Sequence, residues 1–307
     1  MNWYFIAVAP AVAVAAALAY YPARRLGGRS RTLAWLASSA VVGLSPCLIP
    51  LTSKPLRFVG SLIAITLLVK LYDVYMESRL AQRMSLQSYL AYLPNGFWLV
   101  LHKEPGRMLM IRDLRRLACV GSASLLPVFV GVGLWRRDWS AVPFAIEHAL
   151  KVSAVVLAVV LIGNALAAAY RLLGGRALEP MINPIAARTP ADFWRRWNRP
   201  AQQFLSEYIF MPAGGLRGPV RATLVTFGMS GLVHEYVLGI AAGRVQGCQI
   251  LFFALQGCAV VATARTRPSG RILPLWITGT LAFNLSSSVL FFKSVDAVLP
   301  FYWPRIP

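Results

Sequence analysis

The chain contains repeated apolar runs of about twenty residues, the length that a helix needs to cross a bilayer. Hydrophobic residues make up 57% of its 307 residues and charged residues only 14%, whereas soluble domains carry about 25% charged residues. A spanning helix satisfies its backbone polar groups internally. The sequence therefore predicts an all-α fold, a polytopic transmembrane bundle with short interfacial helices, forming one membrane-embedded domain over residues 1–307.

Eight spans are predicted from the apolar runs. Their approximate ranges are 3–21, 33–51, 58–76, 117–135, 152–170, 221–243, 246–264 and 272–292. The second contains Pro46 and Pro50, which would kink a helix. The first lacks the charged leading segment of a signal peptide and is expected to remain in the protein, with its N-terminus outside.

The net charge of +20 follows the positive-inside rule, which places lysines and arginines in cytoplasmic loops. With the N-terminus outside, 22 of the 31 basic residues fall in the predicted cytoplasmic loops and 8 in the outer segments. Basic proteins can also bind nucleic acid, but here the charges lie between apolar runs. We expect an integral membrane protein of the bacterial inner membrane or the endoplasmic reticulum, with membrane lipids and no nucleic acid as partners.

Two long predicted cytoplasmic loops contain apolar stretches that are too short to span. The first, about residues 77–116, is expected to form interfacial helices with arginines at the headgroups. The second contains "RTPADFWRRWNRPAQQFL", residues 188–205. Pro200 suits a helix start, so a short surface helix is expected there.

Ionisable groups inside spans are costly and indicate functional sites. His234 lies about 20 Å along a helix from Arg221, near or beyond mid-membrane. Its near-neutral pKa suits a general base, although a histidine that hydrogen-bonds between helices is the structural alternative. Glu235 lies about 100° round the helix, and either a structural or a supporting role is open to it.

The remaining polar residues of the spans favour structural roles. Lys70 and Asp73 share a helix face and are expected to neutralise each other, with the polar wall of a reaction chamber as the alternative. Asn164 and Asn284 are expected to bridge helices. Histidines 102 and 148 are expected at the surface, and the four cysteines form no CxxC pair, so no metal site or disulfide is predicted.

The arginines and tryptophans of "DFWRRWNRP" have two interpretations. Tryptophan favours the membrane interface and arginine its cytoplasmic side, so an anchoring belt explains part of the cluster. Arginine also binds phosphates through its planar fork. A phosphate-bearing substrate that enters from the cytoplasm is therefore the alternative.

This segment, followed by "SGLVHEY" with its histidine 36 residues after the asparagine, resembles the membrane-bound O-acyltransferase family. Members share a loop of the form FW-x-x-W-(N/H) and a histidine deep in a later hydrophobic helix. The lead "NPIAARTPADFW" and the short chain resemble the wax synthase branch. The motif loop and the helix with the histidine cover residues about 182–243.

The resemblance implies transfer of a fatty acyl group from acyl-CoA, a co-substrate rather than a cofactor, to the hydroxyl of a hydrophobic alcohol. His234 matches the catalytic histidine and Asn198 the motif asparagine. We expect the substrates to be bound by Trp194, Arg195, Arg196, Trp197, Arg199 and Glu235, with no metal. The alternatives are an O-acyltransferase for a glycan or a protein, and a transporter with an intramembrane polar relay, although no internal repeat favours transport.

The charge bias predicts the orientation of the chain. A reporter placed after Pro307 is expected outside the cytoplasm and one inserted near residue 110 inside, because positive loops are retained in the cytoplasm. Alkaline phosphatase and fluorescent-protein fusions measure the two positions. The reverse pair of signals would contradict both the orientation and the cytoplasmic entry of acyl-CoA.

Overall fold

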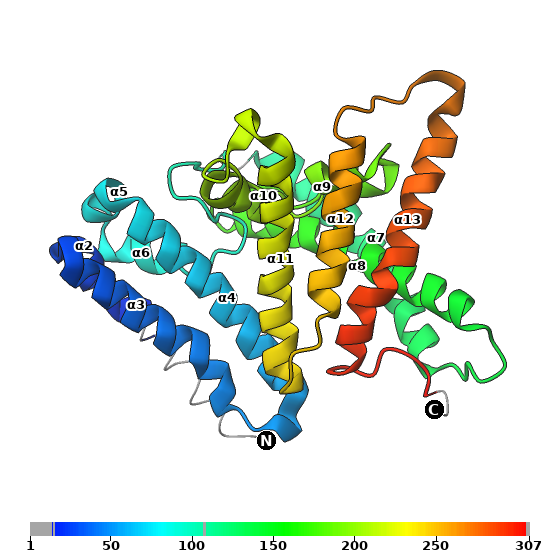
Figure 1. Ribbon diagram of the computed structural model, residues 1–307, viewed down its shortest axis with the longest axis horizontal. Helices are drawn as coiled ribbons and strands as arrows, with labels where there is room; N and C mark the ends of the chain where they lie inside the picture. Colours follow the sequence, from blue (N-terminus) through cyan, green and yellow to red (C-terminus); the bar gives the residue numbers. More distant parts are fainter. Residues whose placement is uncertain (1–13, 15, 107–108, 305–307) are drawn as a thin grey trace. The chain divides into compact units, whose positions relative to one another are not determined.

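The computed structural model describes residue 14, residues 16–106 and residues 109–304, and within these residues the chain is helical and has no β-strand. It divides into two compact units, and Figure 1 labels their helices. The first comprises Met1–Glu104 and Leu232–Gly247, and the second comprises Pro105–Gly231 and Cys248–Pro307. Helix α11 (Pro219–Ala242) continues from the second unit into the first.

The first unit is built from α2 (Tyr20–Arg25), α3 (Gly28–Leu44), α4 (Lys54–Met76), α5 (Ser78–Arg83), α6 (Leu86–Tyr92) and the end of α11. The second contains α7 (Met110–Arg136), α8 (Phe144–Leu172), α9 (Pro190–Arg196), α10 (Arg199–Leu205), the start of α11, α12 (Cys248–Thr263) and α13 (Leu273–Asp296). Short 3-10 turns cover Ser45–Leu48, Leu51–Ser53, Pro184–Ala186, Gly215–Arg217 and Gly270–Ile272, and a π turn covers Ser206–Phe210.

Five helical stretches of the described chain are long and apolar enough to cross a membrane. They are Leu51–Met76, Met110–Arg136, Phe144–Leu172, Pro219–Ala242 and Gly270–Asp296, and they match the third, fourth, fifth, sixth and eighth predicted spans. The all-α polytopic prediction is therefore confirmed.

The count of eight spans is not reached in the described residues. The predicted first span lies mostly outside them. The second corresponds to α3, which has 17 residues and passes into a 3-10 turn at Ser45, because Pro46 lacks the N–H that would continue the helix. The seventh corresponds to α12, which has 16 residues.

Within the first unit, helix ends that the charge bias places on the same side of the membrane lie together. The guanidinium of Arg57 donates to the carbonyl of Ile49 and to that of Ile240, both at 2.8 Å. The Tyr236 hydroxyl donates to the Gly43 carbonyl at 2.6 Å. These bonds hold the end of α11 against the turn between α3 and α4, and Ile49, Arg57 and Ile240 were predicted at or near the outer ends of their spans.

Lys70 and Asp73 face the segment that follows α6. The Lys70 ammonium donates to the Trp98 carbonyl and lies 3.5 Å from the centre of the Tyr92 ring. Asp73 accepts from the Tyr92 hydroxyl at 2.6 Å and from the Leu101 N–H at 3.1 Å. Both side chains are fully buried, so they fix this segment on α4, and the structural interpretation of the pair is favoured.

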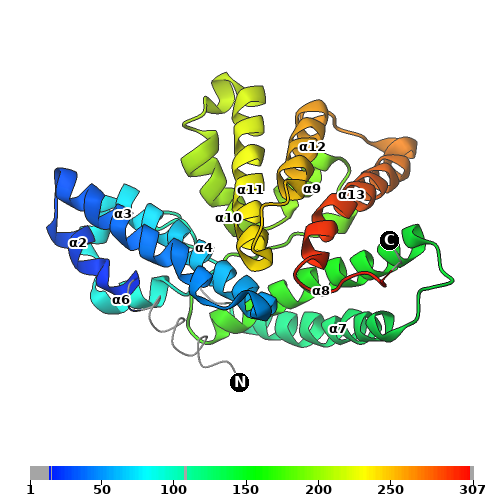
Figure 2. The same cartoon turned by 60° about the horizontal axis from the view of Figure 1, so that its bottom comes forward.

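In the second unit, α7 and α8 run side by side as a hairpin (Figure 2). Each helix begins about two turns before the predicted apolar run, so both carry charged residues. The buried guanidinium of Arg171 donates to Asp113 Oδ1 through Nε at 2.9 Å and Nη2 at 2.6 Å. This pairing allows charged turns to remain helical inside the unit.

Helices α11 and α12 approach closely at glycines. A Cβ at Gly257 would lie 2.9 Å from the Phe227 Cβ, and one at Gly231 would lie 3.1 Å from the Ile250 Cα. Small residues at such contacts let membrane helices pack backbone to backbone. The glycines therefore set the packing of the helix that contains His234.

The prediction that His148 lies at the surface is wrong. Its ring is buried, with Nδ1 2.6 Å from the Tyr302 hydroxyl and Nε2 2.9 Å from the Leu285 carbonyl. A carbonyl only accepts, so Nε2 carries a proton, and the Tyr302 hydroxyl is the partner of Nδ1. Burial raises the pKa of Tyr302, which keeps its hydroxyl protonated. The partner could not be predicted from a local pattern because it lies 154 residues away.

The neighbouring residues of α8 bind the C-terminal segment. Lys151 donates to Glu147 Oε1 at 2.6 Å and to the Phe301 carbonyl at 2.8 Å, and Glu147 Oε1 accepts from the Trp303 N–H at 2.7 Å. Lys151 was counted among the outer-loop charges, but it is buried within α8. Histidine 102, in contrast, is partly exposed and pairs with Glu77 at 3.0 Å.

The Asp113–Arg171 pair predicts a large coupling energy. We expect Asp113→Ala to lower the free energy of unfolding by about 3–5 kcal/mol, because it leaves a buried guanidinium without its carboxylate. In the double variant Asp113→Ala/Arg171→Met, the free energy of unfolding should fall much less than in Asp113→Ala alone. Thermal unfolding of the purified protein in mild detergent, followed by gel filtration, measures both. If the loss in the double variant equals the sum of the losses in Asp113→Ala and Arg171→Met measured alone, the pair is not coupled.

Candidate functional site

The segment "TPADFWRR" forms α9 because its first residues supply a complete helix start. Thr189 is the N-cap, and its hydroxyl accepts from the Asp192 N–H at 3.1 Å. Pro190 occupies the first turn, where the missing N–H has no cost. The Ala191 N–H donates to the Thr263 hydroxyl at 3.2 Å, which attaches the start of α9 to the end of α12.

Asp192 ties two of the motif arginines to α9. Its carboxylate lies 3.0 Å from Arg196 Nη2 and 3.5 Å from Arg195 Nη2, and it accepts from the Arg188 N–H at 3.0 Å. Burial alone would raise the pKa of Asp192, but the hydrogen bonds from Arg196 and Arg188, with the charges of both arginines, outweigh it and lower the pKa. Asp192 is therefore ionised, and about half of the more weakly held Arg195 side chain is exposed.

A line of hydrogen bonds runs from α9 through α12 to α13. The Trp194 indole N–H donates to Gln256 Oε1 at 2.9 Å, and Gln256 Nε2 donates to the Ser287 hydroxyl at 2.9 Å. The Trp194 ring also packs against Phe227 of α11 and Phe253 of α12, with ring centres 5.4 and 5.7 Å apart. Trp194 therefore anchors the motif segment in the helices of the second unit.

Trp197 packs within the motif itself. Its ring stacks on that of Phe193, with centres 5.4 Å apart and planes 18° apart. The backbone N–H of Trp197 donates to the Phe193 carbonyl at 3.0 Å. The two aromatic rings close the last turn of α9 just before the chain reverses at Asn198.

Asn198 adopts a left-handed backbone conformation, with φ of 43°, which asparagine tolerates better than most residues. It is the N-cap of α10, and its Oδ1 accepts from the Ala201 N–H at 3.4 Å. The side chain is exposed. Since Oδ1 is used by the cap, the amide Nδ2 is the group that remains to donate to another molecule.

A buried amide of α8 fixes the backbone beside Asn198. Asn164 donates to the Met181 carbonyl at 3.0 Å and accepts from the Met181 N–H at 3.1 Å. The Met181 sulfur in turn accepts from the Asn198 N–H at 3.3 Å. Asn164 therefore bridges α8 to the motif segment, not to another helix as predicted, and Met181 links it to the motif asparagine.

Two further backbone contacts close the segment around Asn198. The Ile182 N–H donates to the Arg196 carbonyl, and the Arg199 N–H donates to the Pro180 carbonyl, both at 2.9 Å. The Arg199 side chain also donates to the Glu179 carbonyl at 3.5 Å. Pro200 follows in the first turn of α10, so the predicted helix start is confirmed.

His234 and Glu235 lie on the part of α11 that belongs to the first unit. The His234 side chain is half-buried, about 22 Å along the helix from Pro219. Glu235 is buried, and its Oε1 accepts from the N–H groups of Gln246 and, at 2.9 Å, Gly247. Glu235 thus fixes the turn that follows α11, which favours a structural role for it.

The structure brings six of the predicted site residues into one compact segment of the second unit, namely Trp194, Arg195, Arg196, Trp197, Asn198 and Arg199. The other two, His234 and Glu235, belong to the first. Sequence reasoning missed Gln256 and the attachment through Thr263. The amide in the apolar run "FFALQGCAVV" was the available signal, because a polar side chain inside a span needs a partner.

The prediction that Asn284 bridges helices is wrong. Both of its buried amide atoms lack a hydrogen-bond partner among the described residues. It therefore serves as a matched comparison for Asn164, the other lone asparagine of the spans.

The Asn164 amide binds both the N–H and the carbonyl of Met181, an arrangement called here the clamp. We expect this clamp to protect the motif segment from local opening. Asn164→Leu leaves two buried backbone groups unpaired, at about 1–3 kcal/mol each. We therefore expect trypsin to cut after Arg188, Arg195 and Arg196 at least about ten times faster, because cleavage reports local opening. Limited proteolysis with mass spectrometry gives the rates. Asn284→Leu is the control and should leave them unchanged, whereas equal acceleration in both variants would refute the clamp.

The region that contains the motif segment is similar to known proteins. Residues 174–288, which contain α9–α12 and most of α13, match the family model of the membrane-bound O-acyltransferases. A probable sterol O-acyltransferase 2 of Schizosaccharomyces pombe (strain 972 / ATCC 24843) is 30% identical over 61 residues, 20% of this chain and 13% of that protein.

A probable sterol O-acyltransferase 1 of the same organism is 38% identical over 66 residues, 21% of this chain and 12% of that protein. The matched part thus spans only about an eighth of these relatives. Both carry sterol O-acyltransferase names rather than wax synthase names. What is shown is an integral membrane protein with a region that matches the membrane-bound O-acyltransferase family.

Proposed function

We propose that the protein is a membrane O-acyltransferase that moves a fatty acyl group from acyl-CoA to the hydroxyl of a hydrophobic alcohol. The observation that carries the proposal is the family match over residues 174–288. This one region contains the motif asparagine, which the structure holds at the start of α10, and the histidine of α11.

In the proposed reaction His234 is the general base. It takes the proton of the alcohol while the oxygen attacks the thioester carbonyl. The tetrahedral intermediate then collapses, the C–S bond breaks, and the CoA thiolate leaves with the proton returned from the histidine. An ester and free CoA are the products, and a site within the membrane limits hydrolysis of the thioester by water.

Asn198 is proposed to donate to the oxyanion or to orient the acyl donor. Its Oδ1 accepts from the Ala201 N–H at the start of α10. The Nδ2 group is therefore the donor proposed for this role. Oxyanion stabilisation requires a preorganised donor. The clamp from Asn164 through Met181 supplies this rigidity.

The motif arginines are proposed to receive the phosphates of CoA, with unequal parts. Arg196 pairs with Asp192 through Nη2 and donates to the Asn183 carbonyl at 3.4 Å through Nη1. Both terminal nitrogens of its guanidinium are therefore bonded within the segment. Arg195 is more exposed and more weakly paired. Charge-assisted bonds to phosphate are the strong ones, so Arg195 is the first candidate for donor binding.

The acceptor is proposed to be a hydrophobic alcohol because the motif resemblance and the names of the two relatives both indicate that class. The lead into the motif resembles wax synthases, which act on long-chain alcohols, while the two relatives carry sterol O-acyltransferase names. Sterols and long-chain alcohols are therefore the acceptors to compare. The positive-inside rule supports a cytoplasmic motif loop, the side on which CoA is found.

Two substitutions test the chemistry without removing the contacts that the structure shows. We expect His234→Gln to lower acyl transfer by about 10²–10⁴-fold, because an amide hydrogen-bonds but takes no proton at neutral pH. Asn198→Asp keeps the oxygen that caps α10 but removes the Nδ2 donor, and activity should fall by about 10²–10³-fold. Labelled acyl-CoA, a long-chain alcohol and a sterol, with the ester products separated and counted, provide the assay.

The control is His102→Gln, which changes a histidine of the same chain outside the spans and should retain activity. All variants are compared after gel filtration and thermal unfolding, so that loss of fold is not read as loss of chemistry. A folded His234→Gln protein with full activity would remove the general base from the proposal. No ester from any alcohol with the unchanged protein would refute the function itself.

A further inference from the structure

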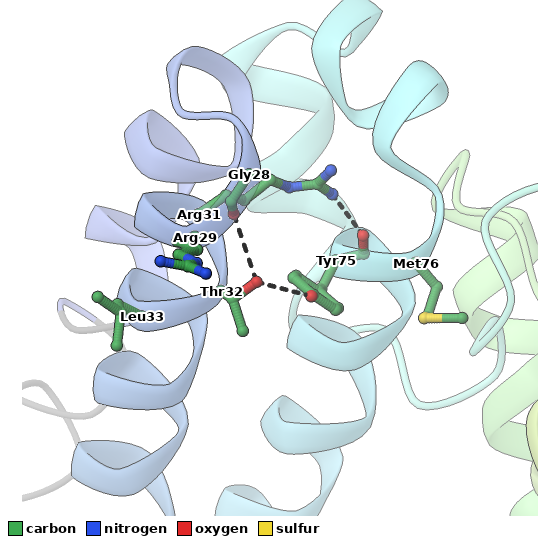
Figure 3. A pocket seen from close by; sticks show the side chains of 7 residues that line it. All are labelled: Gly28, Arg29, Arg31, Thr32, Leu33, Tyr75 and Met76. Carbon is green, nitrogen blue, oxygen red and sulfur yellow. Dashed lines mark hydrogen bonds between the residues drawn. The ribbon is translucent and has the colours of Figure 1, made fainter.

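A pocket outside the motif segment lies in the first unit, between the start of α3 and the end of α4. Its volume is about 610 Å³, and it is lined by Gly28, Arg29, Arg31, Thr32, Leu33, Tyr75 and Met76 (Figure 3). A Cβ on Gly28 would meet nothing within 4 Å. The pocket is therefore open beside two guanidinium groups.

Arg31 is held in place as one wall of this pocket. Figure 3 shows it reaching from α3 to the last turn of α4, where Nη2 donates to the carbonyls of Tyr75 and, at 3.3 Å, Val74. Its guanidinium also lies 5.1 Å from the centre of the Tyr75 ring. Its buried Nε–H has no acceptor among the described residues, although buried donors are nearly always paired.

Neutral donors lie beside this cation. The hydroxyls of Thr32 and Tyr75 are 3.0 Å apart, the Thr32 hydroxyl also donates to the Gly28 carbonyl at 3.4 Å, and both residues line the pocket. Arg29 is exposed and remains on α3 near Leu33 (Figure 3). A guanidinium fork with adjacent hydroxyls matches the several acceptor oxygens of a phosphate group.

The arginines of α2 and α3 have no acidic residue on those two helices. Arginines 24, 25, 29 and 31 take part in no ion pair in the described part of the chain, and the first acidic residue of the sequence is Asp73. The carboxylate of Asp73 is buried and bonded to Tyr92 and Leu101, and that of Glu77, which follows Met76, pairs with His102. An anion from outside the chain is therefore the partner that this cluster lacks.

The pocket also has an apolar side at the end of a candidate span. Met76 is the last residue of the span Leu51–Met76, and the side chains of Leu33 and Met76 are 66% and 50% exposed. Lipid headgroups lie at the ends of spans, and clustered arginines there attract anionic lipids. We propose that this pocket binds the phosphate group of an amphiphile, at a site separate from the motif segment.

Binding of phosphatidic acid by the full-length protein in neutral detergent tests the site. Diacylglycerol, which has the same tails without the phosphate, is the matched lipid. Arg29→Gln removes an exposed guanidinium with no described contact, and we expect it to weaken phosphatidic acid binding about fivefold while leaving diacylglycerol unchanged. Adding Arg31→Lys, which keeps the charge but not the fork, should weaken it further.

The control variant Arg265→Gln/Arg271→Gln removes two exposed arginines from a loop that the charge bias places on the same side, and should leave phosphatidic acid binding unchanged. Inorganic pyrophosphate distinguishes a soluble source of phosphate. If pyrophosphate binds with the same dependence on Arg29 and phosphatidic acid does not bind, the pocket takes a soluble phosphate and the amphiphile is refuted. If Arg29→Gln has no effect on either probe, or no larger effect than the control, the proposal is refuted.

Discussion

The candidate site depends on a constraint that the membrane imposes on backbone polar groups. A loop buried beside spanning helices must have its N–H and C=O groups paired by protein, because lipid supplies no partner. Asn164 meets this requirement at Met181, where one amide pairs both backbone groups. Met181 then contacts Asn198 through its sulfur. A polar residue of a span thereby sets the position of a residue proposed to act in catalysis.

The same constraint explains what sequence reasoning could and could not predict. Apolar runs and charge bias located five of the spans, and the helix ends of the first unit that meet at Ile49, Arg57 and Ile240 were predicted on the same side. Motif spacing identified Asn198 and His234, because the relevant pattern is local. Partners were not predictable, since Met181 lies outside the helix that contains Asn164 and Tyr302 lies 154 residues from His148.

Asn164, Asn284 and His148 show the limit of arguing from a single polar residue. The two asparagines have the same cue, an amide inside an apolar run, yet one is fully bonded and the other has no partner among the described residues. His148 was assigned to the surface because it lies near a predicted helix end. Pairing between Arg171 and Asp113 and between Lys151 and Glu147 allows α8 to extend well beyond its apolar core. Composition alone therefore underestimated the length of the helix and the burial of its first turns.

Arginines that the positive-inside rule counts alike have different physical roles here. Arg171 and Arg196 are paired with carboxylates, and such arginines add little net charge to the surface around them. Arg31 is held by helix carbonyls and a tyrosine ring, groups that fix its position without neutralising it. A cation that is fixed but not neutralised remains able to attract an anion, and it has already lost the side-chain entropy that binding would otherwise require. The same basic loops can thus orient the chain in the membrane and bind a ligand. Whether an arginine is paired with a carboxylate decides whether it remains able to bind an anion.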